Sequence, residues 1–316
     1  MESGRKIEIL DGGIATSLQK AGIRIDEPWL SAAALRDAMG MAALIDIHAQ
    51  FLEAGSGIIG ANTFRTNART LSRIGVAAKE HATFVHRAID CAVQARHVTG
   101  MPQAMVAATV APVEDCYSPE LTPDIDTLRR EHRWMASILA DSPADIVLVE
   151  TQCTQREAVI ATESAREYGL TPWVSFVVSS RASLIDGSDL RQAAHACAEA
   201  GAAALSVNCV HHTAVPRAIE QLADLGLPIG VYPNLEDRTA LGDWEHSATA
   251  LPSAISAERF GSLVRQWVKD YPLAFAGGCC GATPAHIRAM AEAIGSGGSA
   301  PSSRSGSLDT LRRPIP

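Results

Sequence analysis

Short apolar runs alternate with longer amphipathic stretches along most of the chain. Eight of the runs are rich in β-branched residues and are bounded by glycine, proline or charged residues, which is typical of β-strands. The stretches between them repeat apolar residues at helical spacing, as Ile287, Met290 and Ile294 do. The predicted strands cover residues 7–10, 57–61, 104–109, 145–150, 173–178, 203–207, 228–232 and 273–276.

The repeating unit is therefore a strand followed by a helix. Some of the predicted strands are apolar at every position, as residues 146–149 are, which favours a parallel sheet with both faces covered. Eight such strands are the number that closes a parallel barrel, so we predict a (β/α)8 barrel of the TIM type. A doubly wound sheet is the main alternative, but no G-x-G-x-x-G sequence follows the first strand.

One domain is expected to account for most of the length. The chain has 316 residues, and α/β barrels of about 250 residues or more form single domains. No linker interrupts the alternating pattern, so we predict one barrel over residues 1–295. Residues 237–256 are polar and are predicted to form a long loop before the last crossover helix. Glycine and serine dominate residues 295–307, and residues 296–316 are predicted to form a flexible tail.

Charge and composition exclude several classes of function. The net charge is −8 and no run of lysine and arginine occurs, which argues against binding to nucleic acid or to an anionic membrane surface. No apolar stretch approaches the roughly 20 residues that cross a bilayer, and the first residues lack the pattern of a secretory signal. We therefore expect a cytoplasmic protein with seven reduced cysteines, whose partners are small molecules.

The active site of such a barrel lies at the carboxyl ends of the strands. Six predicted strand ends carry polar, glycine or cysteine residues. They read Asp11-Gly12-Gly13, Asn62-Thr63-Phe64, Glu150-Thr151, Asn208-Cys209, Tyr232-Pro233-Asn234 and Gly277-Gly278-Cys279-Cys280-Gly281. Two of these segments contain cysteine, and both are expected to point into the same mouth of the barrel.

Cys209, Cys279 and Cys280 are a suitable ligand set for zinc. Zinc prefers four tetrahedral ligands, and three protein thiolates leave one position open, as in catalytic sites. The glycines around the cysteine pair allow both side chains to face one metal ion. From the residues alone, small buried cysteines at a tight turn remain an alternative. His211 and His212 follow Cys209 closely, but we expect them to face solvent.

Together, these six segments resemble the homocysteine S-methyltransferase family, over residues 7–294. The resemblance implies a zinc-dependent (β/α)8 enzyme that transfers a methyl group to the homocysteine thiolate and so makes methionine. It also implies that the three cysteines bind zinc and that the homocysteine sulfur takes the fourth position.

The same resemblance implies how the substrate is held. Asp11 and Glu150 would bind the α-amino group of homocysteine, and backbone N–H groups around Gly12 and Gly13 would face its carboxylate. Asn208 is expected to fix the loop that carries Cys209. Read alone, Asp11 also fits a simple turn before Gly-Gly, and Glu150 fits a salt bridge.

The expected chemistry needs no acid–base pair. A free thiol has a pKa near 8.5 and reacts as the thiolate, and zinc coordination removes its proton. The leaving group of a sulfonium or ammonium donor departs neutral, so it needs no proton from a general acid.

The methyl donor is less well defined by the sequence. After the third strand, residues 109–117 depart from the family pattern: Ala111 stands where many members have glycine, and Glu114 and Asp115 add negative charge. We expect S-methylmethionine or S-adenosylmethionine before a betaine-type donor. Phe64 and Tyr232 are candidates to face such a cation.

Three alternatives remain open at this level. The same zinc chemistry could act on another thiol or on a selenol. A barrel lyase could bind a phosphorylated substrate at the last glycine-rich turn. A zinc-binding protein without catalytic activity is the third, although an open coordination position argues against it.

Overall fold

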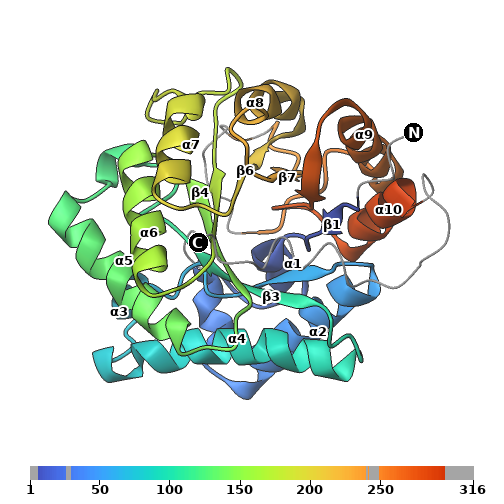
Figure 1. Ribbon diagram of the computed structural model, residues 1–316. Helices are drawn as coiled ribbons and strands as arrows, with labels where there is room; N and C mark the ends of the chain where they lie inside the picture. Colours follow the sequence, from blue (N-terminus) through green and yellow to red (C-terminus); the bar gives the residue numbers. More distant parts are fainter. Residues whose placement is uncertain (1–5, 26–29, 240, 242–248, 296–316) are drawn as a thin grey trace.

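Eight parallel strands form a nearly closed barrel surrounded by helices (Figure 1), which confirms the predicted (β/α)8 class. The computed structural model describes residues 6–25, 30–239, 241 and 249–295. The predicted tail, 296–316, lies outside these residues. The strands are β1 (Glu8–Ile9), β2 (Ile58–Ala61), β3 (Met105–Val110), β4 (Ile146–Gln152), β5 (Pro172–Phe176), β6 (Ala204–His211), β7 (Ile229–Asn234) and β8 (Leu273–Ala276).

Helices follow the strands in the order that the hydrophobic pattern predicts. Two helices lie between β1 and β2 and two between β2 and β3, and each later strand is followed by one. They are α1 (Ile14–Lys20), α2 (Ala38–Glu53), α3 (Ala68–Arg73), α4 (His81–Val98), α5 (Ile125–Ala140), α6 (Gln155–Glu167), α7 (Leu190–Glu199), α8 (Val215–Leu222), α9 (Ala257–Asp270) and α10 (Pro284–Gly295). Short 3-10 turns lie at Leu30–Leu35, Ala78–Glu80, Pro119–Leu121 and His212–Ala214.

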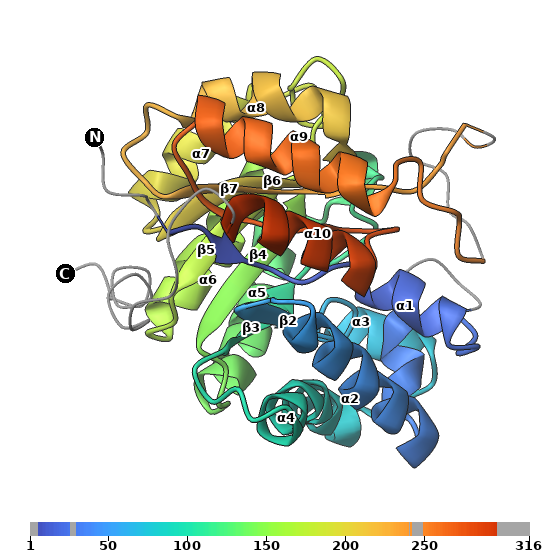
Figure 2. The same ribbon diagram turned by 90° about the vertical axis from the view of Figure 1, so that its right-hand side faces the viewer.

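The barrel closes where its first and last strands meet. β1 pairs in parallel with β8, and neighbouring strands continue in the order β8, β7, β6, β5, β4, β3 and β2. Contact between β1 and β2 is thinner: it consists of a bridge between Leu10 and Ile58 and a 2.8 Å hydrogen bond from the Gly57 N–H to the Ile9 carbonyl. Figure 2 shows α9 and α10 packed side by side on this part of the barrel.

Two apolar layers share the strands. Residues that alternate along each strand point either into the barrel or towards the helices, so that Met105 and Ala107 belong to the inner cluster and Val106 and Ala108 to the outer one. Trp173 lies in the inner layer, with its ring 4.7 Å from that of Phe275. This double burial explains why the strands are apolar at successive positions.

The polar segment before α9 behaves as predicted in its described parts. Residues 237–239 and 249–256 contain no helix or named strand, and an antiparallel bridge joins Glu236 to Ser253. No helix among the described residues is long and apolar enough to cross a bilayer.

The inner layer leaves no room for a side chain at Gly230 of β7. A Cβ atom there would lie 2.1 Å from the ring of Phe275, which itself packs on Trp173. We predict that Gly230→Ala lowers the free energy of unfolding by about 1–3 kcal/mol, because an overpacked core must shift its side chains. Urea unfolding measures the change. Gly295→Ala is the control, since nothing lies within 4 Å of its Cβ position. Equal stability of the two variants would contradict the packing argument.

Candidate functional site

One pocket at the carboxyl ends of the strands contains every site residue singled out from the sequence. Its walls come from the carboxyl-terminal parts of β2, β3, β4, β6 and β7 and from the loops after β1, β2, β3 and β8. The predicted residues that line it are Asp11, Gly12, Gly13, Phe64, Glu150, Asn208, Cys209, Tyr232, Cys279 and Cys280. The residues predicted from the strand ends therefore lie together around one pocket.

The three cysteine side chains converge within this pocket. Their sulfur atoms all lie within 4.8 Å of one another, and the sulfurs of Cys209 and Cys280 are 3.6 Å apart. Cys209 and Cys280 are buried, whereas Cys279 is partly exposed. Such a group of thiols can hold a metal ion.

The environment of Cys209 favours a thiolate. Hydrogen bonds from the thiols of Cys279 and Cys280 hold the pKa of Cys209 well below its usual range, and the Tyr117 hydroxyl adds to the effect. The same sulfur–sulfur contacts, together with burial, raise the pKa of Cys280. Negative charge is therefore concentrated on the sulfur that β6 contributes.

Two further side chains contact this sulfur. The hydroxyl of Tyr117 donates a hydrogen bond to Cys209 Sγ at 3.0 Å, and the side-chain amide of Asn234 lies 3.9 Å from it. Burial raises the pKa of Tyr117 well above its usual range, so the phenol stays protonated and acts as the donor. Tyr117 was not predicted from the sequence. Its only signal was its place in residues 109–117, shortly after the third predicted strand.

Local irregularities in β4 and β6 aim two site residues into the pocket. In each strand one extra residue interrupts the pairing with the neighbouring strand, after Val149 in β4 and after Asn208 in β6. The extra turn places Thr151 and Cys209 at positive φ values of 57° and 51°. Such bulges redirect side chains at barrel rims, here those of Glu150 and Cys209.

Asn208 joins these two bulges. Its side-chain oxygen accepts a hydrogen bond from the Thr151 N–H at 3.0 Å, and its amide group donates to the Thr151 hydroxyl at 2.8 Å. Because Asn208 is fully buried and its amide is engaged on both sides, it acts within the protein as a brace. This agrees with the expected role in fixing the loop that carries Cys209.

Gly12 and Gly13 allow the first and last loops to touch. A Cβ atom on Gly12 would lie 2.7 Å from the Ala282 carbonyl, and one on Gly13 would lie 2.8 Å from the Cys279 carbonyl. The Gly13 N–H donates to the Ala282 carbonyl at 3.2 Å. That pairing argues against the expected contact between this N–H and a substrate carboxylate.

The two carboxylates that line the pocket lack cationic partners among the described residues. Asp11 accepts a hydrogen bond from the Gly60 N–H at 2.8 Å, and no lysine or arginine of the described residues forms an ion pair with Asp11 or Glu150. Burial raises the pKa of Asp11 to about 7. Burial, and then the charge of Asp11, raises the pKa of Glu150 to about 8. A cationic ligand would stabilise the ionised forms of both.

The two aromatic candidates differ in what they present. The Arg65 guanidinium already lies over the Phe64 ring, 4.9 Å from its centre, so a cation of the protein occupies one face. Tyr232 packs in the inner barrel layer, and hydrogen bonding links its side chain to Glu150 and Ser175.

The remaining histidine and cysteine expectations can also be compared with the structure. His211 is exposed and its ring bonds Thr213, which agrees with the expected orientation towards solvent, whereas His212 is only partly exposed. Cys91 and Cys197 are buried in the outer apolar layer. Cys116, next to Tyr117, lines the pocket, which the sequence did not indicate.

Comparison with known proteins gives a consistent result. The family model described as homocysteine S-methyltransferase matches residues 8–294. A selenocysteine Se-methyltransferase of Brassica oleracea is 26% identical over 89% of this chain and 87% of its own. The homocysteine S-methyltransferase YbgG of Bacillus subtilis is 24% identical over 90% and 93%. The metallated form of the Escherichia coli homocysteine methyltransferase MmuM is 23% identical and shares the fold, with a TM-score of 0.76 over 92% of this chain and 96% of that one.

Removing the Asn208 brace tests how the bulges are held. Asn208→Ala leaves the buried Thr151 N–H without a partner, which costs about 1–3 kcal/mol. We predict that loss in urea unfolding, together with weaker metal retention because Cys209 is no longer fixed. Val98→Ala, an exposed change at the end of α4, is the control and should alter neither quantity. Unchanged stability in Asn208→Ala would show that the two bulges are stable without the hydrogen bonds between Asn208 and Thr151.

Proposed function

The chain belongs to the homocysteine S-methyltransferase family and is an enzyme that transfers a methyl group to a thiol, and we propose that Cys209, Cys279 and Cys280 bind the zinc ion that activates this thiol. The acceptor is homocysteine and the product is methionine. Donors of the sulfonium class, S-methylmethionine or S-adenosylmethionine, fit the site best.

The convergence of the three sulfurs carries the proposal. Sulfurs bound to one tetrahedral zinc at about 2.3 Å lie roughly 3.8 Å apart. The 3.6 Å distance between Cys209 and Cys280 is close to that spacing, and Cys279 completes a group within 4.8 Å. The partly exposed Cys279 places the open side of the group towards the pocket. When bound there, zinc keeps a coordinated thiol deprotonated near neutral pH.

Asp11 and Glu150 are proposed to hold the α-ammonium group of homocysteine. Both line the pocket with the cysteines, and both have carboxylates without a cationic partner in the described structure. An ammonium group between them would relieve the repulsion that raises the Glu150 pKa. Asn208 orients the sulfur side of the site through Thr151. For the substrate carboxylate, Gly12 remains a candidate, since the Gly13 N–H is paired within the protein.

A sulfonium donor suits the rest of the pocket. The wall near the loops after β1 and β2 includes Ile14, Ala15 and Phe64, which favour a weakly hydrated cation. Its leaving group departs as a neutral sulfide, so the chain needs no residue to protonate it. Phe64 and Tyr232 are proposed to contact the donor, the former with the ring face that Arg65 leaves uncovered.

A selenol acceptor is the second candidate, since one relative is named selenocysteine Se-methyltransferase. The same sulfur-rich site could orient a selenolate for the same displacement. A lyase that binds phosphate at the last turn gains no support, because the cysteine side chains of that turn point into the group with Cys209.

We predict that zinc-loaded protein forms methionine from homocysteine with S-methylmethionine or S-adenosylmethionine, and more slowly or not at all with betaine. Cys209→Ala, Cys279→Ala and Cys280→Ala should each lose bound zinc and turnover together, because each removes a ligand. Elemental analysis and methionine quantification measure the two. Cys197→Ala, in a buried thiol of α7 outside the pocket, is the matched control and should keep both. Failure of every donor, or full zinc in all three ligand variants, would overturn the proposal.

The proposed ammonium site makes amino-acid binding depend on pH. The pKa values of Asp11 and Glu150 are raised to about 7 and about 8, so both groups are neutral at lower pH and ionised at higher pH. Because an ammonium group binds the ionised forms, affinity should weaken as the pH falls through these values, by up to about tenfold per pH unit for one proton.

Methionine is the best probe, because its thioether, unlike the homocysteine thiol, carries no proton to lose. Calorimetric titration of the metal-free protein at several pH values gives its Kd without the effect of a metal cation on the two carboxylates. Glu150→Gln should bind more weakly and show a flatter pH profile, whereas Glu167→Gln, a carboxylate half exposed on α6, should match the unchanged protein. An identical pH profile in Glu150→Gln would exclude the assigned role.

A further inference from the structure

The segment after β3 contacts the group of three cysteine sulfurs, and it contains none of the six motifs on which the family resemblance depends. Residues 111–117, here called the β3 arm, run from the end of β3 to Tyr117. Cys116 and Tyr117 line the pocket, and the Tyr117 hydroxyl donates to Cys209 Sγ at 3.0 Å.

Side chains from the β2–α3 loop and α3 hold the arm from one side. Arg65 is 4% exposed, and its guanidinium donates to the Glu114 carbonyl at 2.8 Å and to the Pro112 carbonyl at 3.4 Å. It also approaches Cys116 Sγ at 3.5 Å. The Glu114 carboxylate forms ion pairs with Arg69 at 2.9 Å and with Arg73 at 2.8 Å. A buried arginine with three contacts fixes the backbone more firmly than a surface pair would.

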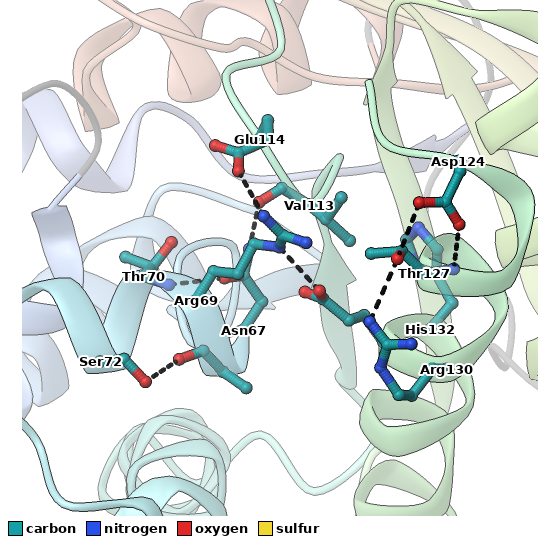
Figure 3. A network of polar contacts seen from close by, with 12 residues as sticks. Asn67, Arg69, Thr70, Ser72, Val113, Glu114, Asp124, Thr127, Arg130 and His132 are labelled. Carbon is teal, nitrogen blue, oxygen red and sulfur yellow. Dashed lines mark hydrogen bonds and ion pairs between the residues drawn. The ribbon is translucent and has the colours of Figure 1, made fainter. Parts of the chain in front are cut away.

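Helices α5 and α6 hold the arm from the other side. The carboxylate of Glu157, at the start of α6, accepts a hydrogen bond from the Val113 N–H at 2.7 Å. His132 of α5 contacts the same oxygen at 3.0 Å, and both side chains are buried. We call these contacts on residues 112–114, from both sides of the arm, the clamp. Figure 3 shows its surroundings, with Val113 between Asn67 and His132 and with Arg69 directed at Glu114.

The clamp therefore positions Tyr117 in advance. The carbonyls of Pro112, Val113 and Glu114 and the N–H of Val113 are each hydrogen-bonded to a side chain of another element. The arm therefore has little freedom to move. Tyr117 is 7% exposed, and a buried phenol requires a hydrogen-bond partner. A sulfur of the proposed metal site provides it.

We propose that Tyr117 is a positioning residue of the metal site, which acts on the metal through its hydrogen bond to Cys209 and is itself held in place by the clamped β3 arm. The inference rests on the proposed function, because it takes Cys209 as a metal ligand. A hydrogen bond to a metal-bound thiolate withdraws electron density from the sulfur. The metal then keeps more positive charge with which to stabilise the substrate thiolate.

Cobalt(II) in place of zinc makes this effect visible. Thiolate-to-cobalt charge-transfer bands move to lower energy when the sulfur becomes more electron-rich. Tyr117→Phe removes only the hydroxyl, so we expect one cobalt per chain, a shift of these bands to longer wavelength, and a loss of turnover of roughly 10–100-fold, as for other partners of metal ligands. A residue that only filled space would leave the bands unchanged.

Tyr168→Phe is the matched control, because Tyr168 is 40% exposed at the end of α6. Its spectrum and turnover should equal those of the unchanged protein. Arg65→Lys tests the clamp: it should shift the bands in the same direction by a smaller amount, and the double variant with Tyr117→Phe should shift no further than Tyr117→Phe alone. If Tyr117→Phe does not fold, the shift in Arg65→Lys still decides the matter.

The outcomes separate the two proposals. Cobalt bands in the unchanged protein that stay the same in Tyr117→Phe and in Arg65→Lys would overturn the role of Tyr117 and leave the metal site intact. If the unchanged protein binds no cobalt and shows no thiolate bands, the metal site itself is wrong, and the inference falls with it.

Discussion

The side chain of Asn208 joins two strand ends that regular β-structure would not bring into position. β4 and β6 are separated by β5, and each ends in a bulge whose residue at positive φ is not glycine. Such backbone conformations cost on the order of 1 kcal/mol or more each and persist only where surrounding contacts fix them. The two hydrogen bonds between Asn208 and Thr151 supply that constraint. The direction of Glu150, and of Cys209 beside Asn208 itself, follows from this brace.

The opposite half of the site depends on close backbone contact rather than on a side chain. The loop after β1 lies against the cysteine turn after β8, and Gly12 and Gly13 permit an approach that a Cβ atom would block. This contact places Asp11 and the pair Cys279 and Cys280 on adjoining edges of the pocket, next to the thin join between β1 and β2. On this side of the molecule, barrel closure and the assembly of the site therefore involve the same loops.

The fold and most of the pocket follow from sequence pattern, since strands buried on both faces are apolar throughout and catalytic residues gather at their carboxyl ends. The bulges do not follow from sequence pattern, because Thr151 and Cys209 have positive φ although neither is glycine, the residue that usually marks this conformation. The ends of β4, β6 and β7 were also not predicted, because these strands extend into polar residues beyond the apolar runs. Tyr117 was missed because its partner is 92 residues away and the contact depends on the clamped arm. The paired Gly13 N–H was likewise invisible, because it depends on how two distant loops meet.

Electrostatics explain why so constrained a pocket suits two cationic substrate groups. Asp11, Glu150 and the Cys209 thiolate share one largely buried space. Burial raises the pKa of both carboxyl groups, and repulsion from Asp11 and Cys209 raises that of Glu150 further. Burial raises the pKa of a nearby acid, Glu236, to about 7 as well, although the Arg238 guanidinium contacts its carboxylate at 3.1 Å. Without ligands this arrangement destabilises the fold as the pH rises, because ionisation is disfavoured in the folded state. A metal cation, the ammonium group of the acceptor and the sulfonium group of the donor would each reduce that repulsion. The unfavourable charge is thus the source of selectivity: a neutral or anionic molecule of the same shape would gain nothing from it.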